Sequence, residues 1–79
     1  NEYDWRSSKY RFTNKPLQEF IDFINRSYHV NIIIKEEKLK ELKFNGTIRK
    51  DEPLTNIIEK ICISLDLKEK QENNNIILY

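Results

Sequence analysis

The sequence predicts an α+β fold made of two βαβ repeats side by side, in the order β-α-β-β-α-β-β. Two segments place apolar residues three and four positions apart behind a proline, which is typical of amphipathic helices. Short alternating or β-branched runs flank each segment, as expected for strands. A shift of 37 residues superposes the two halves, since it places Pro16 on Pro53 and Ile21 on Ile58. Each half is too small to close a core alone, so we expect the two to pack together.

The chain of 79 residues has room for a single domain. Residues 1–9 are mainly polar, and we interpret them as a tail or linker from a preceding domain. Residues 10–79 then form one α+β domain. We expect this domain to belong to a longer protein, because the chain starts at Asn1 and shows no signal peptide.

In the first half, Tyr10 and Phe12 alternate with polar residues, which predicts a short strand. Asn14 is then expected to cap a helix that starts at the following proline. The apolar face of this helix runs to Tyr28. The β-branched run at 30–34 predicts a buried strand.

The second half repeats this order after a charged segment, residues 35–43, which predicts a loop with one helical turn. Residues 44–48 alternate and predict a strand, with Gly46 inside it where a bulge or close backbone approach is needed. Asp51 is expected to cap the second helix, which starts at the next proline. The chain should end in a hairpin that turns at residues 73–74.

Composition excludes several classes of function. The 14 basic and 13 acidic residues give a net charge of +1, whereas nucleic-acid binders and membrane-surface binders normally show a basic excess. The longest apolar runs fall far short of the roughly 20 residues of a membrane helix. One Cys and one His exclude a disulfide framework, a cysteine zinc site and a histidine cluster. We therefore expect no metal, no cofactor and no small-molecule substrate.

Four candidates for chemistry remain, and each has a simpler interpretation. The carboxylate pairs Glu36–Glu37 and Asp51–Glu52 sit among lysines, so we expect them to be solvated and not catalytic. His29 follows the first helix and has no acidic or metal-binding partner nearby in sequence, so a role at the helix terminus is expected. Cys62 lies past the middle of the second helix among isoleucines, which favours a buried, inert thiol. The chain is predicted not to be an enzyme.

Two apolar runs, Ile32–Ile34 and Ile76–Leu78, place apolar side chains on both faces of their strands. If Ile32, Ile34 and Ile77 face the helices, the residues between them point outward. The tail, through Tyr3 and Trp5, is one possible cover for that outer face, and a partner protein is the other. The predicted partner-binding residues are Ile33, Ile76, Leu78 and Tyr79.

The order of these features is similar to that of one family over nearly the whole chain, residues 3–79. The shared positions are Trp5, Tyr10, Phe12, Asn14, Pro16, Leu17, Tyr28, Val30, Ile32, Phe44, Gly46, Ile48, Leu54, Ile57, Asn75, Ile76 and Ile77. Together they resemble the C-terminal domain of FecR-like anti-sigma factors, itself similar to the secretin/TonB short N-terminal domain. The resemblance implies two helices between a two-stranded and a three-stranded sheet. Phe23 and Ile63 lie off the main apolar stripes, as expected for helices covered on both sides.

The resemblance also implies a function. It points to a non-enzymatic, periplasmic interaction domain of an anti-sigma factor that a membrane helix outside this fragment anchors in the inner membrane. Its partner would be the periplasmic signalling domain of an outer-membrane TonB-dependent transducer. A cytoplasmic segment, absent here, would bind the sigma factor. Docking is expected through an open strand edge, and the terminal strand is the favoured edge.

Two alternatives remain. The chain resembles the signalling domain of the transducer itself, although the absence of Ala, the aromatic Tyr28 and the leading Trp5 favour the anti-sigma factor. A small module that binds single-stranded nucleic acid is the second alternative. In that case Tyr10, Phe12 and Phe44 would lie on the sheet surface and stack against bases.

Overall fold

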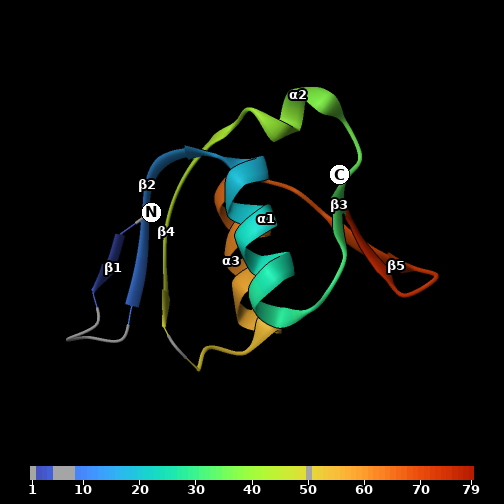
Figure 1. Cartoon of the computed structure of the whole chain (residues 1–79). Coiled ribbons are helices and arrows are strands. Elements are labelled where there is room, and N and C mark those ends of the chain that lie inside the picture. The colour runs from blue at the N-terminus through green and yellow to red at the C-terminus, as the bar shows by residue number, and fades with distance from the viewer. Residues whose placement is uncertain (1, 5–8, 50) are drawn as a thin grey trace.

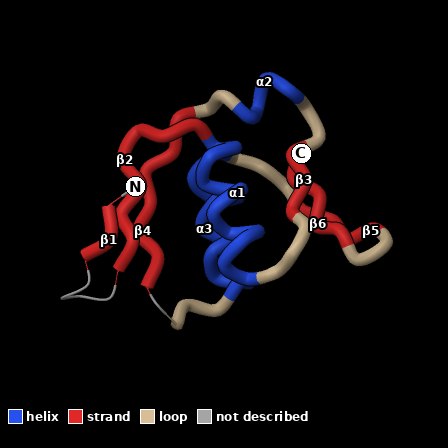
Figure 2. Tube along the Cα trace, in the orientation of Figure 1, coloured by secondary structure: helices blue, strands red, loops and turns tan. Residues whose placement is uncertain are grey.

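The computed structural model describes residues 2–4, 9–49 and 51–79 and has the predicted α+β fold, with two long helices layered between two sheets (Figure 1). The elements are β1 (Glu2–Asp4), β2 (Lys9–Pro16), α1 (Leu17–Tyr28), β3 (Ile32–Ile34), α2 (Glu37–Lys40), β4 (Lys43–Arg49), α3 (Leu54–Leu65), β5 (Glu69–Glu72) and β6 (Asn75–Leu78). The first sheet has the order β1-β2-β4 and the second β3-β6-β5. They lie on opposite sides of α1 and α3 (Figure 2). The predicted two-stranded sheet thus gains a third strand, β1, from the segment interpreted as a tail.

The repeat extends to the ends of both helices. Pro16 and Pro53 are the N-cap residues, and both have extended backbone angles. His29 and Asp66 are the C-caps and adopt the left-handed conformation, with φ of 55° and 56°. Each C-cap amide donates to the carbonyl four positions earlier, which is the αL way of ending a helix. The two strands of each repeat lie in different sheets, so the halves interlock across the helices.

The predicted capping roles of Asn14 and Asp51 are wrong. Neither N-cap has a side-chain hydrogen bond. Asn14 instead lies within β2 at a φ of 52°, where the register between β2 and β4 shifts. Its backbone N–H donates to Asn45 Oδ1 at 2.8 Å. Because β2 continues to Pro16, the N-cap of α1 is Pro16, two residues beyond the expected cap.

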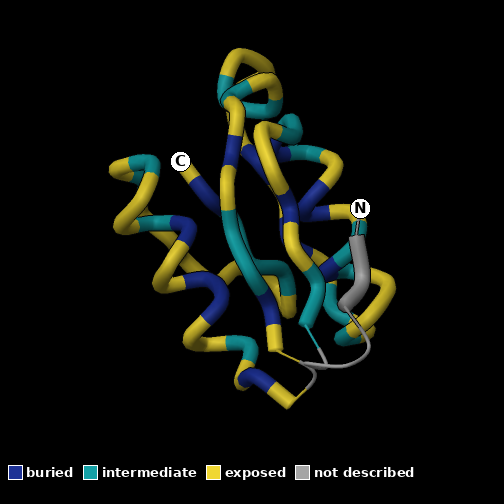
Figure 3. Tube along the Cα trace, turned by 90° about the vertical axis from the view of Figure 1, so that its left-hand side faces the viewer, coloured by how far each residue is buried: buried dark blue, intermediate teal, exposed yellow. Residues whose placement is uncertain are grey.

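An aromatic cluster joins the first sheet to α1. Phe12 and Phe20 meet edge to face with ring centroids 4.7 Å apart, and Phe20 lies 4.6 Å from Phe44. Phe23, off the main stripe of α1, packs 4.5 Å from Tyr10. Phe23 therefore faces a sheet, as its position predicted. Figure 3 shows the alternation of buried and exposed segments along the strands of this sheet.

The predicted core between the helices is confirmed. Its members are Leu17, Ile21, Ile24, Ile58 and Ile61, all buried, with Leu54 partly buried and packed against them. Ile63 is the exception among the apolar residues of α3, because 75% of its surface is exposed. The expectation that Ile63 would be covered by a sheet is wrong.

The closing hairpin forms as predicted, with Asn73 and Asn74 at positive φ in its two-residue turn. Asparagine tolerates this conformation better than most residues, which is why it suits such turns. β6 then pairs on one side with β5 and on the other, in parallel, with β3. The last strand of the described chain is therefore the centre of the second sheet.

Candidate partner-binding surface

The register of the second sheet decides which of its apolar residues face the helices. β3 pairs with β6 in parallel, with Ile32 opposite Ile76 and Ile34 opposite Leu78. Residues opposite one another lie on the same face of a sheet. Ile32, Ile34 and Leu78 are buried, and Ile76 is partly buried and packs against the core. This set forms the inner face.

The outer face carries an apolar patch formed by Ile33, Ile77 and Tyr79, which we call the outer patch. Ile33 is opposite Ile77 in the register, so the two are neighbours on this face. Ile33 is 39% exposed and Tyr79 is 40% exposed, whereas Ile77 is partly buried. The Nζ atoms of Lys35 and Lys70 lie 5.9 Å and 5.5 Å from the centre of the Tyr79 ring. Both distances are within the range of cation–π interactions. The Tyr79 ring therefore lies at the surface between two lysines.

Two of the four predicted partner-binding residues point the other way. Leu78 is fully buried, and Ile76 packs against the core, whereas Ile77 faces outward. The predicted facing of the last strand is wrong by one residue, which exchanges the two faces. Ile33 and Tyr79 are exposed as predicted, and their role in binding stays a prediction.

The predicted docking edge is also wrong. β6 has a neighbour on both sides, so its main chain has no free edge. The edges of the second sheet are β3 and β5. The outer patch therefore lies on the face of the sheet, next to the edge strand β3.

The tail does not cover the outer patch through Tyr3. The strand that contains Tyr3, β1, pairs with β2 at the edge of the first sheet, on the far side of the helices (Figure 1). Trp5, the other candidate cover, lies outside the described residues. The outer patch is therefore not covered by any described part of the N-terminal segment.

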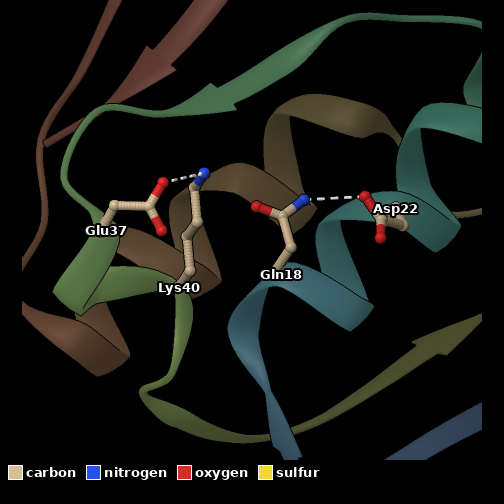
Figure 4. Close-up of polar contacts among 4 residues, drawn as sticks. All are labelled: Gln18, Asp22, Glu37 and Lys40. Atoms are coloured by element: carbon tan, nitrogen blue, oxygen red, sulfur yellow. Dashed lines mark hydrogen bonds and ion pairs between the residues drawn. The ribbon is translucent and has the colours of Figure 1, made fainter.

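The acidic residues around α2 are ordinary surface groups, as predicted. Glu37 accepts from Lys40 Nζ at 2.9 Å, and Gln18 on α1 donates to Asp22 at 2.7 Å (Figure 4). Glu36 lies 3.5 Å from Lys38, and both side chains are largely exposed. Exposed pairs of this kind contribute little to stability.

Glu52 differs from the expectation that both acidic pairs are solvated, because it is buried. Its carboxylate forms an ion pair with Lys60 on α3 and accepts the Arg49 N–H at 3.2 Å. Burial alone would raise the pKa of Glu52, but the hydrogen bonds from Lys60 and Arg49 and their charges outweigh it and lower the pKa. The Tyr28 hydroxyl donates to the Glu52 carbonyl at 2.6 Å. Glu52 thus connects the end of β4 to both helices, and its role is structural.

Neither His29 nor Cys62 forms a reactive site. His29 is exposed and forms the C-cap of α1 through its backbone. Cys62 is partly buried, and burial, assisted by the charge of Glu69, raises the pKa of its thiol. A raised pKa keeps the thiol protonated and weakly nucleophilic. Across the described residues, no three His, Cys, Asp or Glu side chains form a group suited to a metal ion.

Comparison with known protein families shows to which family the chain belongs. Residues 9–78 match the family "FecR, C-terminal". The chain belongs to this family. The match covers the whole domain from β2 to β6 and confirms the resemblance to FecR-like anti-sigma factors. No match was found among curated proteins.

Solved structures share the fold of this FecR C-terminal domain. Two crystal structures of a candidate anti-sigma factor from Parabacteroides distasonis ATCC 8503, at 1.65 and 2.50 Å resolution, superpose with a TM-score of 0.80 at 20% identity. The alignment covers 95% of this chain but 35% of each of those chains. Our chain thus spans about a third of their length. Within the described residues, no helix has both the length and the apolar character needed to cross a bilayer.

Proposed function

We propose that this FecR C-terminal domain is a non-enzymatic, periplasmic interaction domain of an anti-sigma factor. It receives a signal from the periplasmic signalling domain of an outer-membrane TonB-dependent transducer. The full-length protein, anchored in the inner membrane, then changes its hold on a cytoplasmic sigma factor. Membership of the family supports this role, and the structural neighbour, a candidate anti-sigma factor, has the same fold.

The observation that carries the proposal is the outer patch. Ile33 and Ile77 lie side by side on a face that the helices do not cover, and Tyr79 extends the patch. Apolar side chains on such a face add little to the stability of an isolated domain, whereas they suit the core of a protein interface. The flanking Lys35 and Lys70 would form a polar rim.

The fold disfavours the alternative that the domain binds single-stranded nucleic acid, which required three aromatic rings on an open sheet surface. Phe12 and Phe44 are buried, and Tyr10 packs on Phe23 of α1. None of the three lies on an open sheet surface where a base would stack. The charge balance, with a net charge of +1, also disfavours it.

The test is an NMR titration of the labelled domain with the cognate transducer signalling domain. We expect amide shifts in β3, in the end of β6 and around Tyr79. Ile33→Thr keeps a β-branched side chain in the strand but removes apolar surface, so it should weaken binding about fivefold or more. Ile63→Thr makes the same change at an exposed site on α3 and should bind normally.

Two results would reject the proposal. Equal weakening by both variants would mean that the outer patch has no special part in docking. A titration without any shift would reject the transducer domain as the partner.

A further inference from the structure

We propose that the first sheet binds an extended acidic segment of a partner protein, which adds beside the free edge of β4 as a further strand. This surface lies on the opposite side of the helices from the outer patch (Figure 2). The inference does not depend on the proposed docking of a transducer.

The first observation is a cluster of cations on the outer face of the first sheet. We call it the basic face. Its members are Lys9, Arg11, Lys43 and Arg49. Tyr10, Phe12 and Ile48, which alternate with these residues in β2 and β4, face the helices, so the cations point away from them. The whole chain has a net charge of only +1, whereas the part of this face formed by β2 and β4 carries four cations.

In the register of the first sheet, β1 places Glu2 opposite Arg11 and Asp4 opposite Lys9, so the cations of the basic face without an acidic neighbour in the register are Lys43 and Arg49. Neither Lys43 nor Arg49 forms an ion pair with a side chain that the structure describes, although the charge of Arg49 helps to lower the pKa of Glu52. Lys9 is directly opposite Arg49 in the register. Like charges in this position destabilise a sheet. An anionic group that binds beside β4 would reduce this repulsion and would pair with Lys43 and Arg49.

The second observation is the free edge of β4. It is an edge strand of seven residues, whereas the other edge strands have three or four. Apart from its pairing with β2, the main-chain groups of β4 that bond to other described residues are those of Arg49 at its end, where Arg49 O accepts the Glu52 N–H and the Arg49 N–H donates to the Glu52 carboxylate. An edge with free N–H and C=O groups is a site where an extended peptide adds by main-chain hydrogen bonds.

The third observation is that an acidic strand already pairs at the opposite edge of this sheet. β1 pairs with β2, with Glu2 opposite Arg11 and Asp4 opposite Lys9. A strand with acidic residues at alternate positions is thus in register with a strand that has basic residues at alternate positions. A segment of the same kind added to β4 would bring its carboxylates beside Lys43 and Arg49, which lie on the same face.

An acidic peptide fits this surface better than other anions. Single-stranded nucleic acid bound on a sheet stacks its bases on aromatic rings, but Phe12 and Phe44 are buried on the inner face. A lipid surface has no main-chain groups to pair with the β4 edge. An extended acidic segment satisfies both the charges and the edge.

The probe is a short synthetic peptide that alternates glutamate with valine, titrated into the labelled domain. We expect amide shifts in residues 43–49 and affinity that falls with added salt. Two control peptides separate the contributions: one has glutamine for glutamate, and the other is N-methylated at alternate amides and so cannot pair along an edge. Both should bind at least about tenfold more weakly, since each loses a whole class of contact.

Variants of the domain sharpen the test. Arg49→Gln and Lys43→Gln should each weaken peptide binding about two- to fivefold, as expected for one exposed ion pair. Arg26→Gln, at an exposed site on α1, is the matched control and should bind normally. A transducer domain is absent from this experiment, so its failure and the failure of the proposed function are distinguishable.

Several outcomes would overturn the inference. Equal affinity for the N-methylated peptide would exclude strand addition, and shifts confined to the second sheet would exclude this surface. Tighter binding of an oligonucleotide or of anionic lipid vesicles, with the same amides shifted, would assign the basic face to that ligand. Failure of the acidic peptide to bind would reject the site.

Discussion

The two sheets enclose the same helices but differ on both of their faces. The first sheet faces α1 with Phe12 and Phe44, and its outer face carries lysine and arginine. The second sheet faces the helices with isoleucine and leucine, and its outer face carries the outer patch. One domain thus presents a charged surface on one side and an apolar surface on the other.

This difference shows which surfaces stability alone explains. The inner face of each sheet is filled, as a small core requires. The outer face of the first sheet is polar, with the edge of β4 open, whereas the second keeps Ile33 and Tyr79 in contact with solvent. Neither outer face follows from the needs of the core, so both are candidates for binding, with chemically different partners.

The largest expected effect tests the inner and outer faces of the second sheet. Leu78→Ala removes a fully buried side chain and should cost about 2–5 kcal/mol of unfolding free energy. Ile77→Ala, one position earlier on the partly exposed outer face, should cost less than about 1.5 kcal/mol. Urea unfolding monitored by circular dichroism measures both. Equal losses would show that the two faces are not distinct.

The facing of the first sheet was predictable, and that of the second was not. In β2 and β4 polar residues alternate with Tyr10, Phe12 and Ile48, so only one face can be buried. In β6 three apolar residues follow one another, and the hairpin partner β5 is polar throughout. Neither strand carries an alternation that fixes which side is inner. The outward position of Ile77 was missed for this reason.

The second prediction concerns Gly46 in the first sheet. Gly46 has no positive φ, so an unusual backbone conformation is not the reason for glycine here. Close packing is the reason for glycine: a Cβ there would clash with Cε2 of Phe44 and lie 2.8 Å from its Cζ. Phe44 is buried against Phe20 and has little room to move. Gly46→Ala should therefore cost about 1–3 kcal/mol, measured by denaturant titration.

A double-mutant cycle separates this clash from other effects. Phe44→Leu shortens the side chain that crowds Gly46, so Gly46→Ala should cost clearly less in that background. If the cost is the same in both backgrounds, the ring of Phe44 is not what requires glycine. The close approach expected at this position would then have another source.

The burial of Glu52 and the basic face could not be predicted from the sequence, because both depend on residues far apart in the chain. Glu52 lies in a charged segment, and nothing local indicates that Lys60 and the end of β4 enclose it. The basic face likewise arises only when β2 and β4 pair, because Lys9 and Arg49 are far apart in the chain. The balanced total charge of the chain gave no indication of these neighbouring cations on β2 and β4. Tertiary pairing, and not local pattern, creates both sites.

The smallest expected effect tests whether Glu52 anchors the first sheet to the helices by its charge. Glu52→Gln keeps an acceptor for the Arg49 N–H but loses the ion pair with Lys60, and should cost about 1–2 kcal/mol at neutral pH. The folded pKa of Glu52 is below its ordinary value of about 4.3. Its stabilisation is therefore fully present above that value and is lost as the pH falls through the folded pKa. The stability difference between parent and variant should then shrink below about pH 4, in urea titrations at several pH values.

Glu59→Gln, which changes an exposed carboxylate on α3, is the control and should alter stability by less than about 0.5 kcal/mol. A difference that stays constant down to pH 3 would mean that Glu52 acts by shape and hydrogen bonding, and that its charge does not hold β4 to α3.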